Sequence, residues 1–447
     1  MTYNIILGRN ESDRKHFGLN GTIFIGKGYV KMGQTTSLSN NILLDVARSH
    51  VILVSGKRGS GKSHSLSVIA EEIARLPVDI AKNLSVIMFD TMGVFWTMKY
   101  PNLRDEVLLE EWGLKPEGMN IELYVPYGYF HEFKKKGLLV DHPFAIKTSE
   151  LHASEWCDIF GVSLLTPIGV LIERTLEELG KAYGDDYDIE DFELIIEKNK
   201  KAKRGVKDAT VNLFKNVQSW GLLSNKGTTI DKLIQRGKII VIDLSAYSDV
   251  SGNWNIKNLV VGLLGRKLLA ERIKSRKFEE LESIESQEII FLDDKRELEK
   301  PLVWLFIDEA HQFLHKIQKT LASEALIQLL REGRQPGISL ALATQQPGEI
   351  SKEVLTQSDI VISHRLTAKV DLDALNMMMQ SYLLSDIQTL MNNLPRLAGS
   401  AIILDDNSER IYPIQIRPKL SWHGGEAPSA VKYSKKEEIE KELNFEL

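Results

Sequence analysis

The sequence predicts an α/β protein built around a mainly parallel β-sheet, with a helical insertion and a small N-terminal β appendage. Short, wholly apolar segments of strand length alternate with segments whose apolar residues recur at helical spacing. Continuously apolar strands are typical of a parallel sheet that helices cover on both faces. A glycine-rich loop joins the first such strand to a helix. The predicted strands are His50–Ser55, Ser85–Phe89, Lys238–Asp243, Leu302–Ile307 and Ile338–Thr344.

The first half of the chain contains three predicted parts. Residues 1–46 consist of short β segments interrupted by glycines, which predicts the β appendage. Residues 47–115 hold the first two buried strands and the helix after the glycine-rich loop, and form the first part of the core. From 116 to 235 the apolar period becomes mainly helical, which predicts the insertion.

The second half of the chain returns to the sheet. Residues 236–418 form the second part of the core, with a long helix to about Ile273 and an alternating β pair from Ser400. Residues 275–300 are rich in charged side chains, and their apolar residues follow no regular helical or strand spacing. We therefore expect an exposed segment that leaves the core there, the charged excursion. Residues 419–447 form a C-terminal tail that contains a charged helix, KKEEIEKEL.

The composition excludes several classes of protein. The net charge of −5 excludes a protein that coats nucleic acid through bulk positive charge. It does not exclude local basic loops that contact nucleic acid. The single cysteine, Cys157, excludes a disulfide framework and a thiolate zinc cluster, and we interpret it as a buried apolar residue. No apolar run approaches the ~20 residues of a membrane span, and the N-terminus lacks the apolar core of a signal peptide. We therefore expect a soluble, cytoplasmic protein without membrane contact.

Residues Gly56 to Ser63 (GKRGSGKS) satisfy the phosphate-loop pattern in full, and a strand and a helix flank them. Glycines let backbone N–H groups turn towards a β-phosphate, and the helix N-terminus adds a favourable field. We expect Lys62 to bridge the β- and γ-phosphates and Ser63 to ligate Mg²⁺. ATP and Mg²⁺ are thus the expected cofactors, and the predicted nucleotide-binding residues are Gly56, Lys57, Arg58, Gly59, Ser60, Gly61, Lys62, Ser63 and His64.

Two carboxylates follow the apolar strand that ends at Ile307. We expect Asp308 to hold the magnesium through water and Glu309 to orient and deprotonate the attacking water. Asp90, at the end of another strand, has two open interpretations: a residue that reaches the metal, or the start of an ordinary turn. His311 has no second ligand at metal spacing, so we interpret it as structural.

Four stretches of the chain, in this order, resemble the HerA branch of the HerA/FtsK ATPases. They are HVILVSGKRGSGKS, LFIDEAHQFL, LLREGRQPGISLALATQQP and LPRLAGSAIILDD. The resemblance covers most of residues 45–418, apart from the helical insertion and the charged excursion. It implies a RecA-like P-loop NTPase core, a homo-oligomeric, hexameric ring that moves duplex DNA through its pore, and ATP sites between subunits.

The resemblance also assigns roles to four residues. Gln345 takes the place of a polar sensor at a strand end, and Arg331 and Arg334 fall in an arginine-bearing segment. Arg365 lies where the family has another arginine near the nucleotide. A guanidinium donates two hydrogen bonds to phosphate oxygens and offsets the negative charge that develops on them during hydrolysis, which is a physical reason for each arginine to act at the nucleotide. The alternative for each arginine is a surface salt bridge.

Contacts with DNA are predicted from two groups of basic residues. Lys316 and Lys319 follow LFIDEAHQFL, where the resemblance places a segment that faces the pore. Residues 198–207 carry a basic run that either binds phosphates or forms a solvated face. The chain departs from the family where it reads Asp90-Thr91-Met92-Gly93-Val94 without the usual acidic residue, and where its N-terminal segment is short for the family's β-barrel.

Two functions of different classes follow from these observations. The first is Mg²⁺-dependent ATP hydrolysis that drives translocation on, or remodelling of, double-stranded DNA, with a separate nuclease or antiviral effector as partner. The alternative is an ATP-regulated ring scaffold that organises an effector without moving DNA. Stimulation of the ATPase by duplex DNA distinguishes the two.

Overall fold

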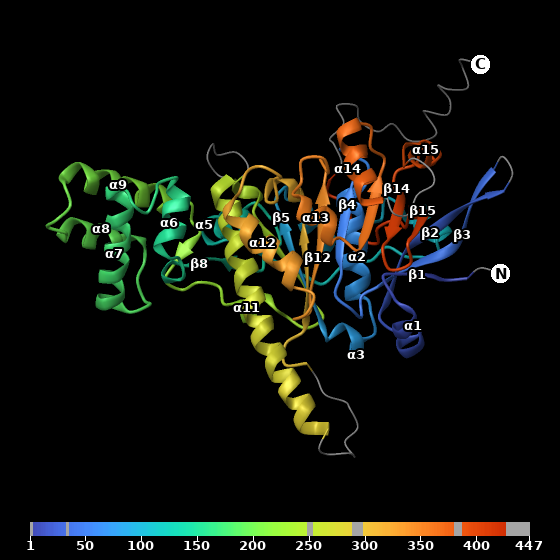
Figure 1. Ribbon diagram of the computed structural model, residues 1–447, viewed down its shortest axis with the longest axis horizontal. Coiled ribbons are helices and arrows are strands. Elements are labelled where there is room, and N and C mark those ends of the chain that lie inside the picture. Colours follow the sequence, from blue (N-terminus) through green and yellow to red (C-terminus); the bar gives the residue numbers. More distant parts are fainter. Residues whose placement is uncertain (1–2, 33–34, 248–253, 288–297, 380–386, 426–447) are drawn as a thin grey trace.

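The computed structural model describes residues 3–32, 35–247, 254–287, 298–379 and 387–425. A sheet with the strand order β1-β3-β2-β15-β14-β13-β4-β12-β11-β5-β10-β6-β7 runs through the molecule (Figure 1). Its strands are β1 Ile5–Leu7, β2 Thr22–Met32, β3 Thr35–Asp45, β4 Val51–Ser55, β5 Leu84–Asp90, β6 Ile121–Pro126, β7 His142–Phe144, β10 Ile239–Asp243, β11 Leu302–Ile307, β12 Ile338–Thr344, β13 Ile360–His364, β14 Ser400–Asp405 and β15 Arg410–Ile416.

The strands from β13 to β7 in this order are all parallel. The predicted mainly parallel sheet is therefore confirmed, and all five predicted strands belong to it. Because the carboxyl ends of parallel strands meet at one edge, the loops after β4, β11, β12 and β13 lie together there.

The N-terminal strands continue the central sheet. The β2–β3 hairpin joins it through β15, which pairs antiparallel with β2 from Ile414 opposite Gly28 to Ile416 opposite Gly26. A Cβ on Gly26 would clash with the backbone oxygen of Gln415, so glycine allows the two strands to approach closely. The β segments expected as a small appendage thus extend the same sheet.

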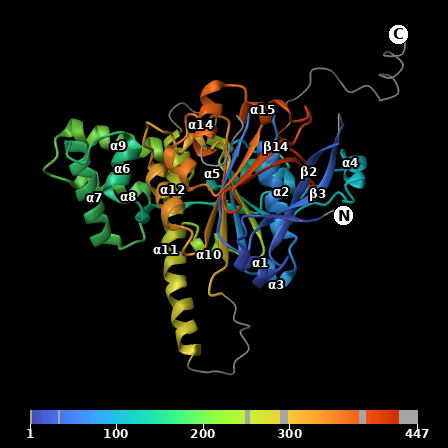
Figure 2. The ribbon, with the colours of Figure 1, turned by 45° about the vertical axis from the view of Figure 1, so that its right-hand side comes forward.

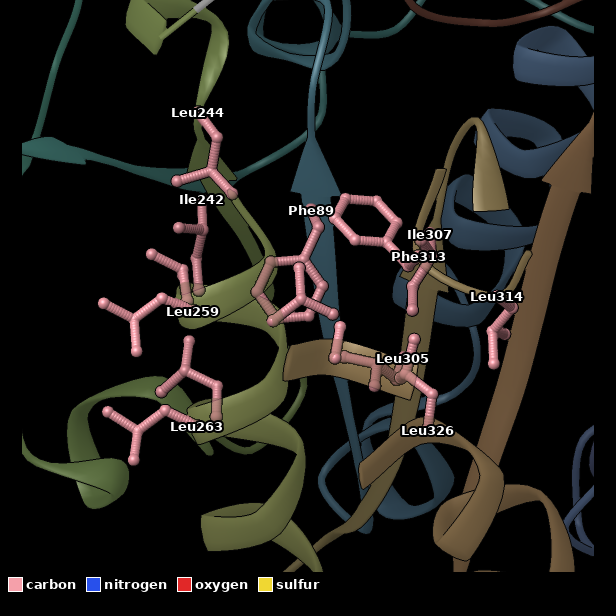
Figure 3. Packing of buried hydrophobic residues seen from close by; sticks show 14 of the residues in the cluster. Phe89, Ile242, Leu244, Leu259, Leu263, Leu305, Ile307, Phe313, Leu314 and Leu326 are labelled. Atoms are coloured by element: carbon pink, nitrogen blue, oxygen red, sulfur yellow. The ribbon is translucent and has the colours of Figure 1, made fainter. Parts of the chain in front are cut away.

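Both faces of the sheet carry a hydrophobic core because side chains alternate along each strand. In β11, Leu305 and Ile307 lie in one cluster with α11 and α12, whereas Trp304 and Phe306 lie in the other cluster with α2. Figure 3 shows the first cluster, in which α11 packs beside β5 and β10. The three covering helices are α2 Lys62–Ala74, α11 Trp254–Gln287 and α12 Leu321–Glu332.

The segment from 116 to 235 combines two strands with a helical bundle. Strands β6 and β7 extend the sheet, which the mainly helical period did not indicate. The bundle then forms around Trp156, Phe192 and Phe214, whose rings lie 4.2–5.6 Å apart, and Cys157 is buried beside them. The segment's helices are α5 Tyr127–Lys135, α6 Ala153–Phe160, α7 Pro167–Tyr183, α8 Ile189–Lys198, α9 Arg204–Gln218 and α10 Ile230–Leu233, and its short strands are β8 Ile146–Lys147 and β9 Leu223–Ser224.

Helix α11 is longer than the sequence indicated. It continues past Ile273 to Gln287, through the first half of the predicted charged excursion. The charged helix expected in the tail lies outside the described residues. No helix among the described residues has the length and apolar character needed to cross a bilayer. The other α-helices are α1 Glu11–Phe17, α3 Val78–Ala81, α4 Glu106–Glu111, α13 Lys352–Gln357, α14 Lys369–Met379 and α15 Ile387–Asn392. The short 3₁₀ helices are η1 Phe95–Lys99, η2 Thr148–Glu150, η3 Ser245–Tyr247 and η4 Ala310–Gln312.

Candidate nucleotide site

The phosphate loop connects the end of β4 to the start of α2. Gly61 caps α2 with a φ of 113°, which a side chain would strain, so glycine is needed there. A Cβ on Gly59 would meet no atom within 4 Å, which means that this part of the loop borders open space. The backbone N–H of Lys57 donates to the carbonyl of Arg365 at 3.2 Å and ties the loop to the end of β13.

His364 lies beneath the phosphate loop. Its Nε2 is 2.8 Å from the Ser65 hydroxyl of α2, and its Nδ1 is 3.1 Å from the carbonyl oxygen of Ser400. A Cβ on Gly56 would lie 2.7 Å from the Cβ of His364, so the loop rests directly on this side chain. Burial lowers the pKa of His364 to about 4 and keeps the ring neutral. Sequence reasoning missed His364, although it directly precedes the predicted Arg365.

The predicted magnesium ligands are in contact. The hydroxyl of Ser63 donates to Oδ2 of Asp308 at 2.6 Å, and Asp308 is buried. Burial raises the pKa of Asp308, although the hydrogen bond from Ser63 opposes this shift. A hydroxyl and a carboxylate that meet at the mouth of a phosphate loop are the oxygen ligands that Mg²⁺ prefers, so these residues fit the expected ion.

Lys62 lies beside the two carboxylates of the site. Its Nζ donates to the carbonyl oxygen of Lys57 at 3.3 Å, within the phosphate loop. Burial lowers the pKa of Lys62, and the nearby charges of Glu309 and Asp308 act in the opposite direction. A nucleotide phosphate would give this buried ammonium the full charge partner that its burial requires.

Glu309 adopts a left-handed backbone conformation, with φ of 53° and ψ of 45°. Non-glycine residues rarely adopt it, and such strain concentrates at functional sites. Oε1 of Glu309 accepts a hydrogen bond from the side-chain amide of Gln345, which follows β12. Oε2 is buried without a hydrogen-bond partner and lies 3.5 Å from Nδ1 of His311. The structure thus brings Glu309 and Gln345 together and places His311 against the same carboxylate.

Within their own chain, the three predicted arginines have other described partners or lie exposed. Arg331, on an exposed part of α12, forms an ion pair with Glu353 at 3.1 Å. The guanidinium of Arg365 donates to the carbonyl oxygen of Leu394 at 3.0 Å. Arg334 is exposed just beyond α12. None of their side chains has a described hydrogen bond to the phosphate loop or Glu309.

Asp90 and His64 have structural partners. Four backbone N–H groups, from Met92 to Phe95, donate to the carboxylate of Asp90, which is the turn interaction. Burial and the nearby Asp243 raise the pKa of Asp90 to about 7. The Nε2 of His64 lies 2.8 Å from the carbonyl oxygen of Arg417 and connects α2 to the segment after β15.

The basic residues proposed to meet DNA differ in their partners. Lys316 donates to Glu349 at 2.9 Å and to the carbonyl oxygen of Gly348 at 3.0 Å. Lys319 is exposed on the same segment. In the run 198–207, Arg204 pairs with Glu197 at 2.9 Å and with Asp208 at 3.0 Å. Lys319 is therefore better placed than Lys316 to meet an external phosphate.

Comparison with known proteins identifies two matching family descriptions. Helicase HerA, central domain, matches residues 30–268, and Helicase HerA-like C-terminal matches residues 286–410. A probable helicase of Methanocaldococcus jannaschii is 25% identical over 438 residues, which cover 95% of this chain and 75% of that protein. The DNA double-strand break repair helicase HerA of Saccharolobus solfataricus is 22% identical over 394 residues, which cover 86% of this chain and 67% of that protein.

A solved structure also resembles the whole fold. VirB4 of Thermoanaerobacter pseudethanolicus has a TM-score of 0.54 at 14% identity, and the match covers 90% of this chain and 97% of that chain. At this identity the similarity shows the fold alone, which is that of a RecA-like P-loop NTPase.

Proposed function

Because the chain belongs to the HerA helicase family, it is an ATPase that binds ATP, and we propose that it couples Mg²⁺-dependent ATP hydrolysis to translocation on, or remodelling of, double-stranded DNA. The observation that supports this best is the meeting of three elements at one edge of the sheet. The phosphate loop, the Ser63–Asp308 contact and the buried carboxylate of Glu309 lie together there. This combination binds a nucleoside triphosphate and activates water.

Each residue has a distinct role in the proposed hydrolysis. Backbone N–H groups of the phosphate loop and Lys62 bind the phosphates. Ser63 and Asp308 would hold the magnesium, which would neutralise negative charge on the phosphates. Glu309 accepts a proton from the attacking water through Oε2, the oxygen that lacks a hydrogen-bond partner. Gln345 orients the same carboxylate through Oε1.

The arrangement of the arginines supports a ring in which each ATP lies between two subunits. A phosphoryl transfer site needs cationic charge near the γ-phosphate, and no described hydrogen bond or ion pair joins Arg331 or Arg334 to this site within their own chain. An exposed guanidinium can instead complete the site of a neighbour. We infer a homo-oligomer, with a hexamer as the proposed state, and a separate nuclease or defence effector as a further partner.

The proposal is tested with the purified full chain and with whatever protein co-purifies with it. Native mass spectrometry gives the number of subunits and the mass of any partner. A motor shows ATP turnover that duplex DNA stimulates, and ATP-dependent displacement of a protein roadblock or a third strand. If an intact ring shows neither effect, the proposal that the protein is a motor is wrong.

One observation favours the second candidate, an ATP-regulated scaffold that organises an effector without moving DNA. Lys316, in the segment proposed to face the pore, is paired with Glu349 within the chain. Such a pair reduces the charge available for DNA phosphates. A ring that assembles with ATP, binds an effector and ignores duplex DNA would support the scaffold.

A further inference from the structure

The second half of α11 projects away from the body of the protein (Figures 1 and 2). Arg272, which is fully buried, fixes the helix where it leaves the body: its guanidinium donates to the carbonyl oxygens of Pro336 and Lys300, each at 2.8 Å. Lys300 precedes β11, so this point lies at the edge of the sheet opposite the phosphate loop. Residues 273–287 extend about 21 Å beyond it at ~1.5 Å per residue.

An apolar stripe follows one side of this projecting segment. Ile273 is 36% exposed, and the three other side chains, Phe278, Leu281 and Ile284, are 47%, 51% and 64% exposed. At 100° per residue in an α-helix these four positions fall within about 140° of the helix circumference. The side chains of Arg272 and Ser275, which are buried, lie on the other side. The stripe therefore faces away from the chain's own core.

The charges beside the stripe change sign along the helix. Lys274 and Lys277 come first, on the same side of the helix as the stripe, and Glu280 and Glu282 follow at its margins. Glu279 instead turns back to pair with Arg272, and Arg276 pairs with Glu280 of its own helix. A second copy of the same helix laid antiparallel places its acidic end beside the basic end of the first. A parallel arrangement would set like charges side by side.

We propose that this stripe binds the same stripe of a second copy of the chain, with the two helices antiparallel. Such a contact is isologous, since each helix presents the same surface to the other. It buries the four apolar side chains and brings Lys274 and Lys277 of one copy close to Glu280 and Glu282 of the other. The contact lies far from the phosphate loop, so it leaves the nucleotide site open.

One such helix pair is smaller than a standard interface, which buries about 800 Å² on each partner. Several pairs that act together gain stability through effective concentration. The inference therefore rests on the proposed ring, because two rings placed face to face would join through one helix pair per subunit. The assembly expected is twice the mass of a single ring.

The first test measures the mass of the full chain by mass photometry and native mass spectrometry. We expect the wild type to form a double ring and Leu281→Glu/Ile284→Glu to form a single ring with unchanged ATP turnover. Leu165→Glu is the matched control, because Leu165 is 90% exposed on another surface, and it should keep the double ring. A wild-type single ring overturns the pairing while leaving the proposed ring intact, and a wild-type monomer overturns both.

The second test uses charge to identify the occupant of the stripe. Lys274→Glu/Lys277→Glu makes the projecting segment acidic, and Glu280→Lys/Glu282→Lys makes it basic. Each variant alone should form single rings, and a mixture of the two preformed rings should recover the double mass. If both variants keep the double mass, or the mixture fails to recover it, a different surface joins the rings. If the stripe instead holds another segment of the chain or another protein, the double ring is absent and the proposal fails.

Discussion

Gln345 donates a hydrogen bond from its side-chain amide to Oε1 of Glu309, and it does so from the strand next to the one that carries Glu309. Glu309 is held in a left-handed backbone conformation at the same time. The contact leaves Oε2 of Glu309 as the oxygen able to take a proton. A residue identified as a sensor by resemblance is thus also a direct partner of the proposed base.

We expect Gln345→Ala to lower kcat by about 10- to 100-fold with little change in KM, because a misplaced base slows the chemical step more than it weakens binding. Steady-state ATPase assays separate the two parameters. Gln346→Ala is the control, since it changes the neighbouring amide. A large rise in KM with unchanged kcat would instead assign Gln345 to nucleotide binding.

The variants Lys62→Ala and Glu309→Gln should separate binding from hydrolysis. Lys62 is placed to contact phosphate in the ground state, so its loss should weaken ATP binding. Glu309→Gln should retain ATP binding and lower turnover by about 10²- to 10⁴-fold, the usual contribution of a general base. Binding is read with a fluorescent ATP analogue, and hydrolysis in a single turnover. If Lys62→Ala and the wild type bind ATP with equal affinity, the assignment of the phosphate loop is wrong.

Stability should depend on pH through His50, which lies buried between Asp45 and Asp359. Burial opposes the charged form, but hydrogen bonds with Asp359 and Asp45 raise the pKa of His50 to about 9. The folded state therefore binds the proton more tightly than the unfolded state, in which the pKa is 6.5. The contribution, about 3 kcal/mol at ~1.4 kcal/mol per pKa unit, is complete below pH 6.5 and is lost as pH rises through 9.

Urea unfolding of the wild type at pH 6 to 10 measures this loss, with His50→Gln as the comparison. The wild type should lose stability towards pH 9 in excess of the variant. His131→Gln, at an exposed position, is the control and should follow the wild type. Parallel pH curves for wild type and His50→Gln would show that the imidazolium contributes nothing.

The two lysines of the predicted DNA segment should differ in their effect. Lys319→Ala should weaken stimulation of the ATPase by duplex DNA more than Lys316→Ala, because Lys316 is already paired with Glu349. Loss of one phosphate contact lowers the slope of log affinity against log salt by about 1. Basal turnover should not change, and Lys215→Ala in the helical insertion serves as the control. An equal loss of basal and stimulated turnover would indicate a role in folding.

The sequence revealed the elements whose signal is local. The buried strands β4, β11 and β12 appear as continuous apolar runs, and the phosphate loop and the pair Asp308–Glu309 appear as motifs beside them. These positions could be predicted because the strand's own residues determine its burial and the motif fixes the turn.

The features that the sequence did not reveal depend on contacts between distant residues. Gly26 pairs with Ile416 across the sheet, and His364 supports the phosphate loop from β13. Arg417, fully buried, forms ion pairs with Glu71 and Glu72 of α2 and ties the chain after β15 to the nucleotide helix. A buried arginine has no local pattern that separates it from an exposed one, so only the fold identifies its partner.

The arginine that completes the site should come from a neighbouring subunit, and Arg334 is the stronger of the two candidates in its segment. Arg331 pairs with Glu353, whereas Arg334 has no such described partner and lies exposed at the corner where α12 ends. A trans-acting guanidinium contributes about 10³-fold or more in related phosphoryl transfers. Arg334→Ala should therefore lose most of its ATPase activity while the ring stays intact, and Arg331→Ala should lose less.

Mixing two inactive variants tests whether Arg334 acts across the interface. A subunit with Arg334→Ala keeps Glu309, and a subunit with Glu309→Gln keeps Arg334, so a mixed ring restores complete sites where the two meet in the right order. In a random one-to-one mixture about one interface in four is complete, since a ring interface is heterologous. The mixture should recover activity that neither parent shows, and dilution below the dissociation range of the ring should abolish it. Arg334→Ala mixed with the double variant Glu309→Gln/Arg334→Ala contains no complete site and should stay inactive. Recovery in that control, or full activity of Arg334→Ala alone, would rule out Arg334 and leave Arg331 and Arg365 as candidates.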